Sequence, residues 1–277
     1  MIQTLFNLIK QTSCFLPQEV HDFIKNLKDN AITKTMQETL NISASHRIPI
    51  CQDTGFPYFY ITLPFAKAPL ISSITSAIQE ALKKAREEGI LRPNSVSPLT
   101  GENYGNNLGL GLPYIDWEFL EDSKAPITCY LLLKGGGSEN ASGQYALPFA
   151  PANASRDLKG VVKVILYHLH QIQGQGCAPG ILGIGLGGDR ISSFKLAKKQ
   201  LFDSFDNPNL DPTLALLEEE IVKKANQLNI GVMGLGQGPT LLAAKIGALA
   251  RHPASFFVSI SYLCWVARRG SCRLPIS

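Results

Sequence analysis

The chain has 277 residues, of which 45% are hydrophobic, 17% charged and 8% aromatic. These proportions are typical of a globular protein with a sizeable core, and they exclude a disordered chain, a collagen and a coiled coil. Lysine and arginine (26) outnumber aspartate and glutamate (22), which gives a net charge of +4. Because this excess is small and scattered, it argues against a nucleic-acid partner but leaves acidic small molecules open as ligands.

No segment predicts membrane insertion or export. The most apolar tract, 254–267, is 14 residues long and contains three serines, whereas a spanning helix needs about 20 apolar residues. The N-terminal residues lack the charged start and the long apolar run of a signal peptide. The six cysteines are far apart and form no CxxC pair, so we expect reduced thiols and a cytoplasmic location.

The spacing of apolar residues and the turn-forming residues predict elements in chain order. In the first half they are a helical segment at 18–41, a strand at 58–65, an amphipathic helix at 72–88 that ends at Gly89, a loop at 92–113, and a buried strand at 127–133. In the second half they are a helix at 158–172, a strand at 181–186, a helix at 192–205 with Ser192 or Ser193 as N-cap, a helix from Asp211-Pro212 to about Asn229 with a solvated face at 218–220, a short helix at 239–249, and a strand at 256–263.

This succession of helices and strands predicts a mixed α/β (α+β) fold. No internal repeat, low-complexity tract or linker interrupts the sequence, so a single domain over 1–277 is expected. Three glycine-rich turns, at 135–137, 183–188 and 231–238, follow apolar runs. Glycine lets backbone N–H groups approach an anion, but none of the turns matches a dinucleotide or P-loop signature. They are interpreted either as tight turns or as parts of a backbone-lined anion site.

Several polar residues and thiols lie where chemistry is feasible, although position alone does not decide their roles. Cys51, Cys177 and Cys264 each lie at a junction between a strand and a loop. Each is interpreted either as a metal ligand or as a small buried residue. Asp53 fits an Asx turn as well as an acid/base group. His252 fits the end of a helix as well as a catalytic site, and Arg92 fits the surface as well as a carboxylate clamp. Cys14, Cys129 and Cys272 are interpreted as structural.

Six motifs in this order resemble the iron–sulfur hydro-lyases, that is, class I fumarases and the α-subunit of L(+)-tartrate dehydratase. The motifs are CQDTG at 51–55, LRPNS at 91–95, KGGGSEN at 134–140, GCAPGILGIGLGG at 176–188, GVMGLGQGPTLLAAKI at 231–246, and RHPASFFVSISYLCWVARR at 251–269. The combination of CQDTG with KGGGSEN is specific to this family, whereas either fragment alone is not. The resemblance spans roughly residues 30 to 270 and implies the single, cluster-binding domain of the iron-dependent fumarase α type.

The resemblance implies one [4Fe–4S] cluster bound by Cys51, Cys177 and Cys264. Three ligands for four irons leave one iron open, and an open iron can polarise a C–O bond whose leaving group is otherwise poor. The reaction also moves a proton beside a carboxylate, which requires a positioned acid/base group. The matching positions imply Asp53 and His252 for proton transfer, and Gln52, Arg92 and Gly137 for contacts to the substrate.

Two motifs depart from the family's usual form: GENYGNNLGLGLPY stands where an NTGDN-type segment is common, and GCAPG replaces CPP. The sequence also contains no counterpart of the family's C-terminal, β-type domain, which contributes further arginines, a lysine and a threonine to the active site. The resemblance therefore implies that the chain needs a β-type subunit, in an α₂β₂ assembly, for full activity. It also implies activity that decays in air and recovers with Fe²⁺ and thiol.

The leading hypothesis is a hydro-lyase subunit that acts on a C4 dicarboxylate, with the fumarate-to-malate reaction favoured by the motif at 251–265. Dehydration of L(+)-tartrate or a mesaconate-type substrate is an alternative within the same class. A non-catalytic regulatory module that binds an anion through its glycine turns is an alternative of another class. A structural zinc protein is a third, which the long spacing between the cysteines disfavours.

Overall fold

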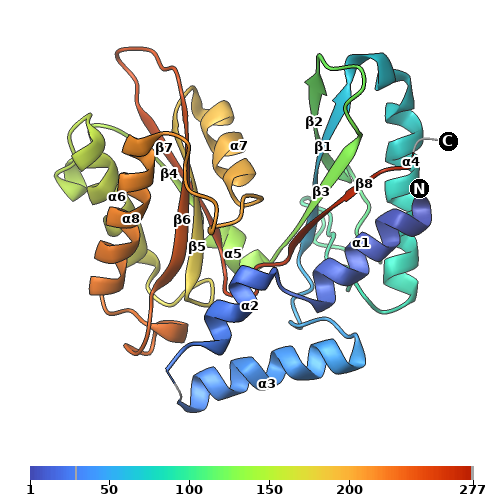
Figure 1. Ribbon diagram of the computed structural model, residues 1–277, viewed down its shortest axis with the longest axis horizontal. Helices are drawn as coiled ribbons and strands as arrows, with labels where there is room; N and C mark the ends of the chain where they lie inside the picture. The colour runs from blue at the N-terminus through green and yellow to red at the C-terminus, as the bar shows by residue number, and fades with distance from the viewer. Residues whose placement is uncertain (29, 276–277) are drawn as a thin grey trace. The chain divides into compact units, whose positions relative to one another are not determined.

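The structure is a computed structural model that describes residues 1–28 and 30–275. Its mixed α/β class is the one expected. The chain forms two compact units (Figure 1): unit 1 contains Met1–Pro17, Thr35–Gly135 and the segment from Arg268 onward, and unit 2 contains Gln18–Lys34 and Gly136–Ala267. Among the described residues, no helix combines the length and apolar character needed to cross a bilayer.

Unit 1 is a four-stranded sheet with helices on one face (Figure 1). Its strands, in the order β2-β1-β3-β8, are β2 (Tyr114–Leu120), β1 (Phe56–Pro64), β3 (Thr128–Lys134) and β8 (Arg269–Arg273). Strand β1 is parallel to β2 and antiparallel to β3, and β8 is antiparallel to β3. The helical elements are α1 (Ile2–Cys14), η1 (Phe65–Leu70) and α4 (Ile71–Glu87), and α3 (Ala31–His46) begins in unit 2 and continues into unit 1.

The core of unit 1 lies between this sheet and helices α1 and α4. Alternate residues of β1 (Phe59, Ile61 and Leu63) face the core, as the two-residue period of a strand requires. They pack with the apolar stripe of α4, which includes Ile74 and Ile78. The predicted amphipathic helix is thereby confirmed, and so is its end at Gly89, which has a φ of +72°.

Unit 2 is a second four-stranded sheet with helices on both faces (Figure 1). Its strands, in the order β4-β7-β5-β6, are β4 (Gly143–Ala146), β7 (Phe257–Leu263), β5 (Gly180–Gly187) and β6 (Leu241–Leu249). Strand β5 is parallel to β6 and antiparallel to β7. The helical elements are α2 (Gln18–Lys25), α5 (Gly136–Asn140), η2 (Ala150–Ala152), α6 (Leu158–Ile172), α7 (Arg190–Gln200), α8 (Pro212–Gln227) and η3 (Val232–Gly234).

The centre of this sheet explains one of the glycine-rich segments. Every residue of β5 is buried, because α7 covers one face of the sheet and α6 and α8 cover the other (Figure 1). A Cβ on Gly183 would lie 2.1 Å from the carbonyl oxygen of Ala197, and one on Gly185 would lie 2.0 Å from that of Ser193. These glycines therefore allow the backbone of α7 to approach the strand. The segment is a packing feature at these two positions.

Three expectations from the sequence are wrong. Residues 241–249 form strand β6 and not a helix, so His252 follows the end of a strand and not the end of a helix. The N-cap of α7 is Asp189, whose carboxylate accepts a hydrogen bond from the backbone N–H of Ser192 and so completes a capping box. Glu218, expected on a solvated face of α8, is only 8% exposed.

Some elements have no counterpart in the sequence-based prediction, namely α1, α5, β2, β4 and β8. The other predicted helices and strands are confirmed to within a few residues. The helical segment 18–41 is divided into α2 and α3, and the helix that opens at Asp211-Pro212 is α8, capped by the carboxylate of Asp211.

Candidate functional site

The CQDTG segment forms a compact loop just before β1 in unit 1. The Asp53 carboxylate accepts a hydrogen bond from the N–H of Gly55 at 3.0 Å, which is an Asx turn. Gly55 has a φ of +82°, and a Cβ there would lie 2.6 Å from the backbone of Leu133 in β3. Glycine is therefore required at this position, and the loop is packed directly onto the sheet.

This loop brings together the predicted residues Gln52, Asp53 and Arg92. The Thr54 hydroxyl accepts a hydrogen bond from the N–H of Arg92 at 3.0 Å. The Arg92 guanidinium donates to the carbonyl oxygen of Gln52 at 3.5 Å. Since Arg92 is exposed, most of its donors can reach a ligand, and its planar fork suits a carboxylate. Cys51 is half-buried at the start of the same loop.

Arg268 also contacts this loop; it lies within the motif at 251–269, but nothing in that motif indicates this contact. Its guanidinium is buried and donates to the carbonyl oxygen of Asp53 at 2.6 Å. The other side of Asp53 lies against Gly135, where a Cβ would be 2.7 Å from the carboxylate oxygen Oδ2. Both contacts join residues far apart in the sequence, so no local pattern indicates them. Together they fix the backbone and limit the space of the Asp53 side chain.

In unit 2, the sheet topology brings Cys177 and Cys264 to the same edge. Cys177 precedes β5 and Cys264 follows β7, and because the two strands are antiparallel, Ile181 lies opposite Leu263. The backbone N–H of Trp265 donates to the carbonyl oxygen of Cys177 at 3.4 Å. Cys177 is exposed, with a φ of +58°, and Cys264 is half-buried. Both thiols are therefore candidates for an external ligand.

Gly137 lies in the same part of unit 2. It belongs to the short helix α5. The residue after it, Ser138, accepts a hydrogen bond at its hydroxyl from the N–H of Cys264 at 3.2 Å. A Cβ on Gly137 would have no atom within 4 Å, so space is open above its backbone. Tyr262 is also close: burial first, and then the neighbouring thiols of Cys264 and Cys177, raise the pKa of its phenol.

The structure does not bring His252 to these two cysteines. His252 is exposed in the turn between β6 and β7, where its Nδ1 accepts a hydrogen bond from the N–H of Ala254 at 3.1 Å. Cys264 lies beyond the opposite end of β7. A strand of seven residues spans about 23 Å at 3.3 Å per residue. Within unit 2, His252 therefore does not share a site with Cys177 and Cys264, and its catalytic role remains a prediction.

The donor groups present suit an iron–sulfur cluster. The thiols of Cys51, Cys177 and Cys264 are unoxidised and none is fully buried, and cysteine thiolates are the ligands that hold iron–sulfur clusters. Cys177 and Cys264 lie at the same end of the sheet of unit 2. Among residues 1–28 and 30–275, no group of three or more His, Cys, Asp or Glu side chains is arranged to hold a metal ion.

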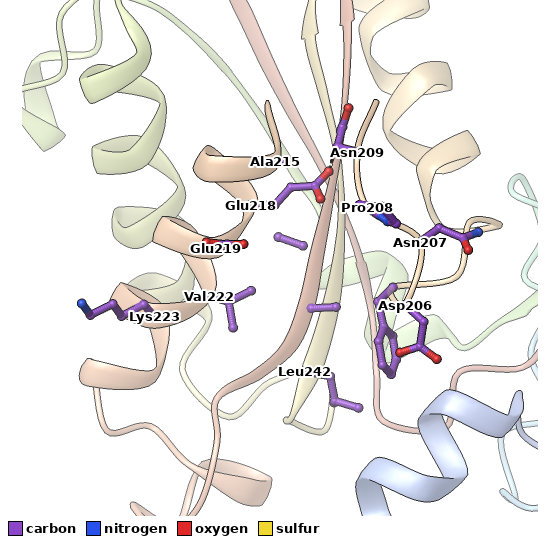
Figure 2. Close-up of a pocket in the computed structure, with 13 residues that line it drawn as sticks. Asp206, Asn207, Pro208, Asn209, Ala215, Glu218, Glu219, Val222, Lys223 and Leu242 are labelled. Carbon is purple, nitrogen blue, oxygen red and sulfur yellow. Dashed lines mark hydrogen bonds between the residues drawn. The ribbon is translucent and has the colours of Figure 1, made fainter. Parts of the chain in front are cut away.

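A cavity in unit 2 is separate from the predicted site residues. It has a volume of about 550 Å³ and lies between α8, the loop 205–209 and strand β6 (Figure 2). Its buried acid, Glu218, accepts hydrogen bonds from the Asn209 side chain and the N–H of Ile246, both at 2.7 Å, and pairs with the Lys245 ammonium at 3.2 Å. Glu218 thus closes the free edge of β6, and its acceptors are already in use.

Comparison with known proteins places these features in a family. The model of the family described as Fumarate hydratase (Fumerase) matches residues 2–273. A protein of Geobacillus stearothermophilus named fumarate hydratase class I is 44% identical over 280 residues, which cover 97% of this chain and 54% of that protein. A Methanocaldococcus jannaschii protein named L(+)-tartrate dehydratase subunit alpha is 34% identical over 97% of this chain and 95% of its own length. The subunit of that name from Escherichia coli K12 is 27% identical over 98% and 89%.

The chain therefore spans about half of the Geobacillus protein and nearly all of the alpha subunits. The resemblance seen in the motifs is confirmed by the match over nearly the whole chain. This chain belongs to the fumarate hydratase (Fumerase) family.

Proposed function

We propose that this chain is the α-type part of a hydro-lyase that interconverts fumarate and malate. The observation that carries the proposal is the CQDTG loop, which holds the Asp53 carboxylate in an Asx turn directly after the thiol of Cys51 and accepts a hydrogen bond from the Arg92 guanidinium at the carbonyl oxygen of Gln52. A dicarboxylate substrate needs a cation to bind it and an acid/base group to move a proton at the carbon beside the carboxylate. Asp53 of the loop and Arg92, which is hydrogen-bonded to the loop, supply these two groups. Membership of the family supports the same reaction class.

In this proposal Cys51, Cys177 and Cys264 hold a [4Fe–4S] cluster. When bound, the cluster supplies a Lewis-acid iron that polarises the C–O bond of the substrate hydroxyl. Arg92 binds one substrate carboxylate with its planar fork, and Gln52 and the backbone of Gly137 contact the rest of the molecule.

Asp53 transfers the proton. In the dehydration direction its carboxylate takes the proton from the carbon beside the substrate carboxylate, and in the hydration direction it returns the proton there. The Asx turn holds this carboxylate by one oxygen, Oδ1. His252 is a second candidate for this step, and a variant of each residue separates their contributions.

A separate β-type subunit completes the active site in this proposal, in an α₂β₂ assembly. The relatives named alpha subunits match this chain over nearly their full length, which supports a division of the enzyme into two chains. A cytoplasmic location is part of this proposal, because six widely spaced cysteines without a CxxC pair are typical of reduced thiols.

Dehydration of L(+)-tartrate is the second candidate function, because two relatives that this chain covers to 95% and 89% of their length carry the tartrate dehydratase name. A mesaconate-type substrate is a further variant of the same chemistry. The test is to co-express the chain with a β-type subunit, purify the complex without oxygen, and measure turnover of fumarate, L(+)-tartrate and mesaconate. We expect the highest kcat/KM with fumarate, and a loss of turnover in Asp53→Asn. A loaded complex that turns over none of the three would refute the proposal.

A further inference from the structure

Arg268 is a buried cation that forms no close ion pair with a carboxylate among the described residues. Its side chain is 1% exposed, and no aspartate or glutamate among the described residues lies within ion-pair distance of it. Its Nε is buried and has no hydrogen-bond partner. Burial of an unpaired charge is costly, and a neutral residue of similar volume is often the more stable choice. The fold alone therefore gives no reason for an arginine here.

The backbone of Arg268 is firmly placed. Its carbonyl oxygen accepts a hydrogen bond from the N–H of Leu133 at 2.9 Å, and Arg269, the next residue, begins strand β8, which pairs with β3. Arg268 is thus anchored to the same strand against which Gly55 packs. Its guanidinium extends from this rigid support to the CQDTG loop.

The contacts of the guanidinium converge on Asp53. One terminal nitrogen donates to the Asp53 carbonyl oxygen at 2.6 Å. The other lies 3.8 Å from the place of a Cβ on Gly135, where the Asp53 carboxylate oxygen Oδ2 is 2.7 Å away. The guanidinium therefore fixes the backbone of Asp53 and extends along the same glycine as its carboxylate. The Asx turn to Gly55 holds the other carboxylate oxygen.

We propose that Arg268 is a positioning residue that holds the segment 52–55 so that the Asp53 carboxylate keeps the orientation needed for proton transfer. This inference rests on the proposed function, because the orientation affects the reaction only if Asp53 carries the proton. A buried guanidinium beside the loop also favours an anionic ligand over a neutral one. This gives a reason for an arginine where a neutral donor would suffice for the fold.

The test compares Arg268→Gln and Arg268→Lys with Arg273→Gln, which removes the same charge from an exposed position near the end of β8. The first readout is hydrogen exchange of the peptide 51–57 in the assembled complex. It does not depend on activity. We expect faster exchange in Arg268→Gln, part of that change in Arg268→Lys, and no change in Arg273→Gln. Equal exchange in all variants would overturn the proposal.

The second readout is steady-state kinetics with fumarate, with iron and sulfide counted for every variant. A displacement of about 1 Å at a reacting group can cost about 100-fold in rate, so we expect kcat of Arg268→Gln to fall by about that factor, with KM changed much less. Arg268→Lys should recover part of the loss. In an Asp53→Asn background, Arg268→Gln should cost little more, since two residues that act through one step are not additive. If the two substitutions lower kcat by independent factors that multiply in the double variant, a role of Arg268 through Asp53 is overturned.

The two proposals fail in different ways. If the loaded wild-type complex has no hydro-lyase activity, the proposed function fails and the exchange experiment still decides whether Arg268 holds the loop. If the wild type is active but Arg268→Gln keeps its kcat and its exchange rate, the role of Arg268 fails alone. If Arg268→Gln does not fold, Arg268→Lys and Arg273→Gln provide the same comparison.

Discussion

Replacement of Gly135 by alanine tests whether the position of the Asp53 carboxylate controls the reaction. The new Cβ would lie 2.7 Å from the carboxylate oxygen Oδ2 and 3.3 Å from the carboxyl carbon, whereas ordinary contact begins near 3.4 Å. The oxygen must therefore retreat by about 0.7 Å, the difference between these two distances. The backbone of Gly135 has no positive φ that would itself exclude alanine, so the substitution acts mainly on Asp53.

The expected effect on stability is small and the expected effect on rate is large. A side chain forced about 30° from its preferred rotamer costs about 0.5–1.5 kcal/mol, which bounds the loss of unfolding free energy. A displacement approaching 1 Å at a catalytic group can cost up to about 100-fold in rate. At 1.36 kcal/mol per tenfold, this is a rise of up to about 2.7 kcal/mol in the activation free energy. We expect kcat to fall by about 10- to 100-fold.

The assay is the steady-state rate of fumarate hydration by the assembled, loaded complex, together with thermal unfolding of each variant. Gly137→Ala is the control for the unfolding measurement, because a Cβ there meets no atom within 4 Å. It should unfold at the wild-type temperature. A Gly135→Ala complex with wild-type cluster content and a kcat within about twofold of the wild type would refute the role given to Asp53.

Three further predictions concern groups away from the site. Glu218→Gln leaves the buried Lys245 ammonium without its closest anion, although Asn207 and Asp203 still contact it. We therefore expect the free energy of unfolding in urea to fall by about 3 kcal/mol, the low end for a broken buried pair. An unchanged midpoint of urea unfolding would contradict the pairing. Burial lowers the pKa of His168. Below about pH 6.5 the unfolded chain therefore takes up a proton that the native state does not, and the protein becomes less stable as the pH is lowered. Urea titrations at pH 7 and 5.5 should show this loss in the wild type and a smaller one in His168→Gln. The hydrogen bond from Cys129 lowers the pKa of the half-buried Cys272 thiol, while burial raises that of Cys14; iodoacetamide should therefore label Cys272 at lower pH than Cys14, and the reverse order would refute the assignment.

Local sequence patterns predicted the elements whose signals are themselves local. The apolar stripe and glycine end of α4, and the Asp-Pro start of α8, depend on residues within a few positions of each other, and both are confirmed. Strand β6 was misread because its leucines and alanines favour a helix. It is buried beside β5 in a parallel pair, and such strands show a continuous apolar run without the alternation that identifies a half-exposed strand.

The same distinction applies to the candidate site. The Asx turn of CQDTG follows from an aspartate two residues before a glycine, and the roles proposed for Cys51, Gln52 and Arg92 come from family resemblance. Arg268 could not be predicted, because its contact with Asp53 joins residues 215 apart and arises only when β8 pairs with β3. The partner of Glu218, Lys245, is also distant in sequence, so a buried acid was taken for a solvated one.

The most direct test of the account is the iron and acid-labile sulfide content of the complex purified without oxygen, for the wild type and for Cys177→Ser. One [4Fe–4S] cluster bound by Cys51, Cys177 and Cys264 gives about four of each per chain in the wild type, and the variant should lose both. We further expect that air removes activity and that Fe²⁺ with thiol restores it. Absence of iron and sulfide after anaerobic reconstitution would contradict the account and favour an anion-binding module in which the cysteines are structural.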